Sequence, residues 1–318
     1  MADLVAVTGA NGWIGRRVCH WLELTGHAVR RLGRDVRVPE TVGLDLALPA
    51  EDGQWPRALQ GCAAVVHCAA HVHRPVETTA EQAMFQAINV TGTDKLLAAS
   101  RAAGVRRFVL AGSAAVYDWS EGRPLAEDGP VAPVTAYART KLQAEELVRA
   151  SGLDWRIGRL ATVYGSGDGA NFLRLARALK TSRFVIPGRG EARKSILPVD
   201  RAGELLARLA VTDEVRYGIL NLAAPVAPDL REICAGFSQA CGFPSAPHAP
   251  RWLLAAGALL GDGAQAMRLP APLTSETLRK LTTSTHLDVT RMQQAFPDLA
   301  WRDFAAEVAL AASHYVAS

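Results

Sequence analysis

The strongest constraint on the fold is a regular alternation of short apolar runs and longer helix-like stretches in the first half of the chain. Strand-like runs occupy residues 4–9, 27–33, 63–70, 107–113 and 154–161, and helix-like stretches occupy 15–26, 81–104 and 137–152. Apolar strands that alternate with helices are typical of a parallel sheet with helices on both faces. The sequence therefore predicts an α/β protein with a doubly wound parallel sheet.

The second half of the chain has a different texture. After Gly165 proline is more frequent and the apolar residues are irregularly spaced, with glycine- and proline-rich stretches at 186–198 and 243–250. One strand-like run, at 217–224, is placed to rejoin the sheet. We therefore expect a first domain over 1–164, rejoined by about 196–224, and a smaller lobe made mainly of 165–318.

Composition narrows the possible partners and the compartment. The net charge is only +4 and the arginines are scattered, whereas nucleic-acid-binding proteins usually carry a dense basic stripe. The five cysteines are odd in number and form no C-x-x-C pair, which argues against disulfides and a zinc site. No signal peptide is apparent, and the longest apolar run, 252–260, is too short to cross a bilayer. We expect a soluble cytoplasmic protein without a nucleic-acid or membrane partner.

The first chemical motif is TGANGWIG, at 8–15, where a strand gives way to a helix. Glycines at this spacing let the backbone turn tightly and approach a pyrophosphate, and the helix N-terminus attracts the negative charge. This junction predicts a dinucleotide site. The residues we assign to it are Gly9, Asn11, Gly12, Trp13, Ile14 and Gly15.

The end of the second strand indicates which dinucleotide is bound. NAD enzymes place an acidic residue there for the ribose hydroxyls, whereas NADP enzymes use arginine for the additional phosphate. Here Gly33 leaves room and Arg34 offers charge-assisted, bidentate contacts to a phosphate. We predict a preference for NADP(H). The alternative, which keeps NAD(H) possible, is that Arg34 is a solvated surface charge and Asp35 reaches the ribose.

Two further segments are assigned to the cofactor. Asp45 and Leu46 follow a third short apolar stretch, and the Asp45 carboxylate is able to accept a hydrogen bond from the adenine amino group. The strand at 63–70 ends in small residues, so that a flat cofactor can pass close over Ala69 and Ala70.

A set of short motifs in a fixed order now identifies a family. TGANGWIG, LDL, VVHCAA, INVTGT, FVLAGSAAVY, YARTK, RLATVYG, IPGRGE and LPVDRAGE follow one another from Val5 to about Ala223. In this order and spacing the chain resembles the extended short-chain dehydrogenase/reductases of the epimerase/dehydratase branch, which act mainly on nucleotide sugars; the tail at 273–299 resembles them more loosely. The resemblance implies a Rossmann-type sheet with a C-terminal substrate-binding lobe.

The stretch TAYARTK, at 135–141, predicts a proton-transfer pair. Tyr137 and Lys141 are four residues apart, so in a helix they share one face. A carbonyl that accepts hydride needs a proton as the alkoxide forms, and a tyrosine with its ordinary pKa of about 10 exchanges protons reluctantly near neutral pH. We expect the Lys141 ammonium and an oxidised nicotinamide to lower the Tyr137 pKa.

The resemblance assigns roles at the predicted catalytic site. It implies that Tyr137 is the acid/base, that Lys141 tunes it and holds the nicotinamide ribose, and that Ser113 orients the substrate oxygen. Asn89 is the position that the family uses to support the active-site strands and the lysine. Two departures stand out: Ala114 and Ala115 replace the acidic pair of the dehydratases, which argues against dehydration, and Leu160 replaces a usual proline.

The reaction and the substrate are constrained less tightly. We expect an NADP(H)-dependent reduction of a keto group on a nucleotide-linked (deoxy)sugar. The alternatives are an NAD-dependent nucleotide-sugar 4-epimerase, a reductase of a small aldehyde, ketone or steroid-like substrate, and a non-enzymatic NADP-sensing or scaffold protein. The residues assigned to substrate are His71, Ala115, Asn171 and Arg193.

Three minor expectations complete the set. His71 and His73 lack a third metal ligand nearby in sequence and are assigned to a loop at the substrate cleft rather than to a metal. Asp200 is expected to order a loop beside the sheet. Relatives pair the helices at 81–104 and 137–150 across a twofold axis, so the resemblance implies a homodimer.

Overall fold

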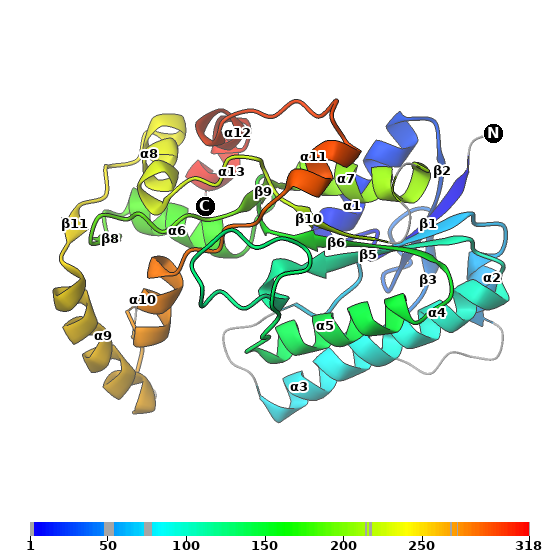
Figure 1. Ribbon diagram of the computed structural model, residues 1–318, viewed down its shortest axis with the longest axis horizontal. Helices are drawn as coiled ribbons and strands as arrows, with labels where there is room; N and C mark the ends of the chain where they lie inside the picture. Colours follow the sequence, from blue (N-terminus) through cyan, green and yellow to red (C-terminus); the bar gives the residue numbers. More distant parts are fainter. Residues whose placement is uncertain are drawn as a thin grey trace.

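A computed structural model describes residues 3–47, 54–72, 78–213, 215, 218–267, 269–271 and 273–317. Within them a parallel sheet has the strand order β10-β6-β5-β4-β1-β2-β3 (Figure 1). Its strands are β1 (Leu4–Thr8), β2 (Ala28–Gly33), β3 (Thr41–Gly43), β4 (Ala64–His67), β5 (Arg107–Ser113), β6 (Asp154–Leu160) and β10 (Gly218–Leu222). The predicted doubly wound α/β fold is confirmed, and the run near 217–224 rejoins the sheet as β10 beside β6.

Helices cover both faces of this sheet (Figure 1). On one face lie α1 (Trp13–Leu24) and α7 (Val199–Val211), and on the other lie α2 (Gln54–Leu59), α4 (Gly92–Ala102) and α5 (Ala136–Arg149). Alternation along β1 explains the two layers: Val5 and Val7 pack with the α1 and α7 side chains, whereas Ala6 packs with those of α4 and α5. Both faces are apolar because both are covered.

The helix expected over 81–104 is interrupted. It consists of α3 (Thr79–Phe85), a π-helical segment (Gln86–Thr91) and α4. Thr78 begins α3 with a capping box, since its side chain accepts from the Glu81 amide while the Glu81 carboxylate accepts from the Thr78 amide. π-Helical turns of this kind occur frequently at functional sites.

A second lobe is built around aromatic side chains. Tyr164, Phe172, Phe237, Phe304 and Tyr315 contact one another in its core. The helices around this core are α6 (Asn171–Lys180), α8 (Leu230–Cys241), α12 (Phe304–Leu310) and α13 (Ala312–Ala317). Two small parallel pairs lie outside the main sheet: β7 (Thr162–Tyr164) with β9 (Ile196–Pro198), and β8 (Ile186–Pro187) with β11 (His248–Ala249) at the far end of the lobe (Figure 1).

Three more helices complete the described chain. Helices α9 (Arg251–Ala266) and α10 (Ser275–Thr282) project from the end of the second lobe, and α11 (Thr290–Ala295) returns over β10 (Figure 1). None of the described helices combines the length and the apolar character that a membrane span needs.

Candidate active site

The predicted catalytic residues lie at the carboxyl end of the sheet, where ligands of doubly wound folds bind. Ser113 is the last residue of β5. Helix α5 begins at Thr135, whose hydroxyl accepts a hydrogen bond from the Ala138 amide at 3.1 Å, so Tyr137 lies in the first turn and Lys141 one turn further. Strand and helix together bring the three side chains to one place.

Hydrogen bonds fix this group. The Ser113 hydroxyl lies beside the Tyr137 hydroxyl, where it favours the ionised form of the tyrosine. The buried Lys141 Nζ donates to the Ala111 carbonyl oxygen at 2.6 Å, two residues before Ser113 on β5. An ammonium has three donors, so this bond anchors Lys141 and leaves two donors for a ligand.

The protonation states differ from the sequence-based expectation. Burial raises the pKa of Tyr137, and the Ser113 hydroxyl beside it offsets only part of that effect. Burial lowers the pKa of Lys141 to about 8, against the opposing charge of Glu145. The protein's own groups therefore hold Tyr137 protonated, and the expected lowering of its pKa by Lys141 is not what this arrangement produces.

Asn89 lies within the π-helical segment and is buried. Its side-chain oxygen accepts from the His71 amide at 2.7 Å, and its nitrogen donates to the His71 carbonyl and to the Thr140 hydroxyl, both at 3.1 Å. Asn89 thus joins the segment after β4 to helix α5 at the residue next to Lys141.

A buried chain of hydrogen bonds runs through His67, which sequence reasoning did not single out. The Thr93 hydroxyl donates to the Asn89 carbonyl at 2.7 Å, so it accepts from His67 Nε2 at 3.0 Å. On the other side of the ring, the Thr8 hydroxyl accepts from the Ala69 amide at 3.3 Å and donates to His67 Nδ1 at 2.6 Å. Burial lowers the pKa of His67 to about 3, so the ring stays neutral, and every donor has an acceptor.

A second buried network, also not predicted, begins one turn beyond Lys141. The Glu145 carboxylate, 0% exposed, accepts from Arg159 on β6 at 2.8 Å and 3.1 Å. The Arg159 guanidinium lies 4.7 Å from the centre of the Tyr117 ring, whose hydroxyl donates to Asn221 at 2.7 Å. The Tyr137, Lys141, Glu145 spacing of four residues was the available signal, because it places all three on one helix face.

The glycine turn has the sterics that a dinucleotide motif requires. Gly9 has φ of +65°, and a Cβ there would lie 2.9 Å from the Ala69 backbone. A Cβ on Gly15 would lie 2.1 Å from the Gly9 carbonyl oxygen, so only glycine lets α1 approach β1 this closely. The Gly12 amide closes the turn by donating to the Gly9 carbonyl at 2.8 Å.

The other residues assigned to this turn hold neighbouring segments. Asn11 donates to the Asp35 carbonyl at 3.2 Å and accepts from the Thr41 hydroxyl at 3.3 Å. Trp13 Nε1 donates to the Ser166 carbonyl at 2.7 Å, which ties the turn to the second lobe. Ile14 packs against the core on the α1 side of the sheet.

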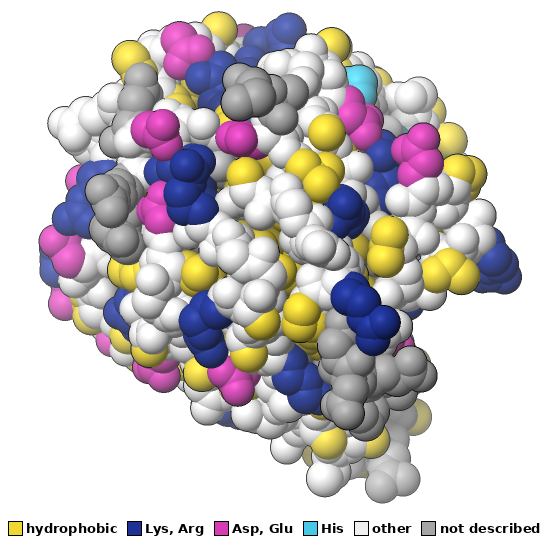
Figure 2. All heavy atoms as spheres, turned by 90° about the vertical axis from the view of Figure 1, so that its right-hand side faces the viewer, with side chains coloured by type: hydrophobic (Ala, Val, Ile, Leu, Met, Phe, Trp, Pro, Cys, Tyr) yellow, Lys and Arg dark blue, Asp and Glu magenta, His cyan; other side chains and the backbone are white. Residues whose placement is uncertain are grey.

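The arginines near the end of β2 are not equivalent. Arg31 forms ion pairs with Glu23 and Glu40. The exposed Arg37 donates hydrogen bonds to both carboxylate oxygens of Asp35, at 2.8 Å and 3.0 Å. Arg34 is also exposed, and within the described part of the chain it forms no ion pair or side-chain hydrogen bond. Figure 2 shows the face that lies on the right in Figure 1, where basic, acidic and apolar side chains are interspersed.

Asp45 and Leu46 follow β3. The Asp45 carboxylate is half-buried and accepts from the Ala47 amide at 3.0 Å. The Leu46 side chain is 5% exposed and packs in the core. Ala69 and Ala70 are half-buried at the end of β4, beside the glycine turn.

The predicted substrate residues are spread over two regions. His71 lies close to Tyr137, because its ring packs edge-on against Phe85 at 4.6 Å and Phe85 packs against Tyr137 at 6.3 Å. The exposed Ala115 follows Ser113. Asn171 begins α6 and accepts from Arg174, and the exposed Arg193 donates to the Ala227 carbonyl at 3.0 Å. His73 lies outside the described residues.

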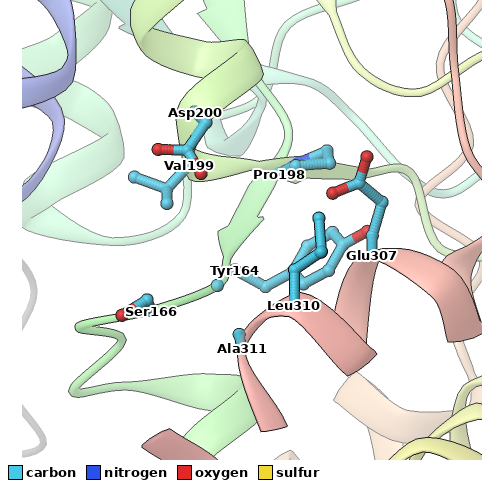
Figure 3. A pocket seen from close by; sticks show the side chains of 9 residues that line it. Tyr164, Ser166, Pro198, Val199, Asp200, Glu307, Leu310 and Ala311 are labelled. Carbon is cyan, nitrogen blue, oxygen red and sulfur yellow. The ribbon is translucent and has the colours of Figure 1, made fainter. Parts of the chain in front are cut away.

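Two remaining features are structural. Leu160 ends β6 paired with both Ser113 and Leu222, and its amide lets the strand continue between two neighbours, where proline is disfavoured. Asp200 lies in the first turn of α7 rather than in a loop, and it accepts from Arg17 at 3.3 Å. It also lines a small pocket of about 40 Å³ with Tyr164 and Glu307 (Figure 3), far too small for a dinucleotide.

Comparison with known proteins agrees with this geometry. Residues 5–223 match the NAD dependent epimerase/dehydratase family. The chain belongs to this family.

Two curated relatives and one solved structure illustrate the proteins to which this chain is similar. A dTDP-4-dehydrorhamnose reductase of Streptomyces griseus is 37% identical over 171 residues, covering 52% of this family member and 52% of the relative. The 4-hydroxy-2-methyl-3-oxo-4-farnesyl-3,4-dihydroquinoline-1-oxide ketoreductase of Stigmatella aurantiaca is 32% identical over 191 residues, or 56% and 55% of the two chains. This chain thus spans little more than half the length of either relative. MoeE5 in complex with UDP-glucose and NAD superposes with a TM-score of 0.75 at 25% identity over 97% of each chain.

Proposed function

We propose that this family member reduces a keto group on a nucleotide-linked (deoxy)sugar, with hydride from NADP(H) and a proton from Tyr137. The observation that carries the proposal is the grouping of Ser113 at the end of β5 with Tyr137 in the first turn of α5, with Lys141 anchored one turn further along the helix, beside the glycine turn. The dTDP-4-dehydrorhamnose reductase and the ketoreductase among the relatives support reduction. MoeE5, solved with UDP-glucose, supports a nucleotide sugar.

Each catalytic side chain has a defined task in this proposal. When bound, the nicotinamide supplies the hydride. The Tyr137 hydroxyl gives its proton to the oxygen of the reduced carbonyl, and the Ser113 hydroxyl donates a hydrogen bond to that oxygen as negative charge develops. Lys141 uses its two remaining donors for the nicotinamide ribose.

The residues after β5 argue for reduction over elimination of water. Ala114 is buried and Ala115 has no ionisable group, so neither position supplies the additional acid and base that a dehydratase needs. The family also contains epimerases, and the structure of MoeE5 with NAD favours this second candidate. An epimerase would retain NAD through purification, whereas a reductase exchanges its cofactor.

NADP selection is assigned to Arg34. Among the arginines near the end of β2, Arg31 and Arg37 are committed to acidic partners, and the Asp35 carboxylate is held by Arg37 rather than turned to a ribose. The proposal also keeps the other cofactor assignments made from the sequence. These are Gly9, Asn11, Gly12, Trp13, Ile14, Gly15, Asp45, Leu46, Ala69, Ala70 and Asn89. His71 and Ala115 are assigned to the sugar, and Asn171 and Arg193 to the diphosphate.

The proposed reaction is tested by NADPH oxidation with a panel of nucleoside-diphosphate keto sugars. Tyr137→Phe removes the proton donor, and we expect the rate to fall by about 10²- to 10⁴-fold while NADPH binding, followed by fluorescence, is kept. Turnover of the variant at the wild-type rate would refute the role of Tyr137. If the sugar were epimerised without net consumption of NADPH, the protein would be assigned as a nucleotide-sugar epimerase instead of a reductase.

The cofactor assignment is tested separately. Arg34→Ala should weaken NADPH binding about 10- to 100-fold, the loss expected for charge-assisted hydrogen bonds, with little change for NADH. Arg37→Ala is the matched control, since it removes an arginine from the same segment that is already paired. Equal losses of both nucleotides in Arg34→Ala would eliminate selection by this residue.

We also propose a homodimer through α4 and α5, which contact each other on one face of the sheet. Light scattering coupled to size exclusion tests it, with a monomeric mass as the contrary result.

A further inference from the structure

Helix α9 presents a continuous apolar surface to solvent. Trp252 is 73% exposed, Leu259 68%, Leu260 78% and Met267, at its C-cap, 69%. Their spacing along the chain places them on one side of a helix together with the small residues Ala256 and Gly263. Exposed apolar residues are common singly, but a contiguous group of this size marks an interaction surface.

The orientation of α9 is fixed by its opposite side. Ala258 is 0% exposed, and a Cβ on Gly261 would lie 1.8 Å from the Leu273 carbonyl oxygen, so this side is packed too closely for the helix to rotate. The Asp262 carboxylate accepts from the Ser275 amide at 2.9 Å at the beginning of α10. The apolar side therefore points outward because the other side is committed to Leu273 and α10.

The charge at the beginning of this surface is positive. No charged residue occurs from 252 to 261, and Arg251 stands just before the apolar stretch. Arg251 is exposed, and a Cβ on Gly188 would lie 3.1 Å from its Cγ, which brings the segment with Arg189 and its ion-pair partner Glu191 beside it. Asp262 is the acidic residue of α9, and its carboxylate accepts a hydrogen bond from the Ser275 amide at the beginning of α10.

We propose that α9 docks on an anionic lipid surface, with its apolar side in the interface and Arg251 among the headgroups. An apolar helix face with tryptophan and arginine at its edge is the composition that lies in the plane of a membrane, and this 16-residue helix need not span it. This departs from the expectation of no membrane partner. It is independent of the reaction at Tyr137.

Electrostatics favours lipid over a second copy of the chain. A symmetric helix pair would bring a second Arg251 to the interface, and Asp262, the acidic residue of α9, already accepts from the Ser275 amide and is not available to balance these charges. Like charges brought together oppose association, whereas anionic headgroups neutralise them.

Sedimentation with vesicles tests the proposal. The full chain is mixed with vesicles of phosphatidylglycerol and phosphatidylcholine, or of phosphatidylcholine alone. We expect binding to the anionic vesicles that weakens with added salt, and a loss of about tenfold or more in the Leu259→Gln, Leu260→Gln double variant. Leu24→Gln, at a leucine 74% exposed on α1, is the control and should bind as wild type.

The contrary results are distinct from one another. No binding of wild type to anionic vesicles, or equal binding of the double variant, overturns the proposal. A mass decrease of the double variant in light scattering, without vesicle binding by wild type, would assign α9 to a second copy instead. Unfolding by urea and NADPH oxidation, unchanged in the double variant, establish that the change is confined to the surface.

Discussion

Strand β6 carries two buried arginines, Arg156 and Arg159, whose surroundings differ sharply. They are three residues apart and therefore lie on opposite faces of the sheet. Arg159, toward α5, is paired with Glu145, also donates to the Glu127 carbonyl at 3.0 Å, and stacks on Tyr117. Arg156, toward α7, donates through Nη1 to the Leu209 and Thr212 carbonyls. Its Nη2 lies 3.7 Å from the Asp154 carboxylate, but neither Nε nor Nη2 has a hydrogen-bond partner among the described residues.

The pKa shifts of the two guanidinium groups record the same difference. Burial would lower the pKa of Arg159, but the hydrogen bonds and charge of Glu145 outweigh it and raise the pKa. For Arg156 burial, followed by the nearby charge of Arg107, lowers the pKa to about 10. The arginine with hydrogen-bond and charge partners, Arg159, is thus the one that lies beneath α5, the helix that carries Tyr137 and Lys141. We infer that the Arg159 side of β6 serves the site and that the Arg156 side serves only to hold α7.

The largest effect is expected from breaking the paired side. Glu145→Gln leaves the Arg159 guanidinium buried without a counter-charge, and we expect a loss of about 3 kcal/mol or more in the free energy of unfolding by urea. Glu146→Gln is the control, because Glu146 is the exposed neighbour on α5, and it should change stability by less than about 0.5 kcal/mol. Equal effects of the two substitutions would contradict the importance given to the pair.

Much of the site could be predicted from sequence because its signals are local. The glycine turn, the strand ending at Ser113 and the four-residue spacing of Tyr137 and Lys141 each depend on neighbours in the chain. Contacts between distant segments carry no such signal. The His67 chain joins Thr8 to Thr93, and the Arg159 network reaches Asn221, so the fold has to be known before either can be recognised.

The protonation of Tyr137 was outside the reach of sequence for a related reason. Spacing places Lys141 on the same side of α5 as Tyr137, but it does not show that Nζ is directed to the Ala111 carbonyl. Burial, which raises the Tyr137 pKa and lowers that of Lys141, depends on every element packed around the site. Exposure of α9 is also a tertiary property, since an apolar run of the same composition is ordinarily buried.

A smaller effect is expected on the pH dependence of the proposed reduction. Lys141 has a pKa of about 8, so the rate that depends on its ammonium should fall as the pH rises through that value. Glu145 favours the charged form, and Glu145→Gln therefore lowers the Lys141 pKa and moves the alkaline limb of kcat/KM to lower pH. Measurement at a temperature where the variant stays folded separates this shift from instability. An unmoved limb, with Glu146→Gln again as the control, would disconnect the ion pair from catalysis.

The smallest effect is expected on the other side of β6. Arg156→Met removes a buried guanidinium that has two nitrogens without a hydrogen bond and a long ion pair, 3.7 Å, to Asp154, and puts in its place an apolar side chain of similar length. The substitution gives up two hydrogen bonds to α7 but also removes the cost of burying the charge, and Asp154 keeps its pairing with Arg107 at 2.9 Å. Such replacements are frequently neutral, so we expect the free energy of unfolding to change by no more than about 1 kcal/mol and the pH profile to be unaltered.

The matched substitution on the other face is Arg159→Met. It leaves the Glu145 carboxylate buried without a counter-charge and should lower the free energy of unfolding by about 3 kcal/mol or more. The contrary result would be an equally large loss in the free energy of unfolding by urea for both methionine variants. Both arginines would then serve stability alike, and the assignment of one face of β6 to the site would fail.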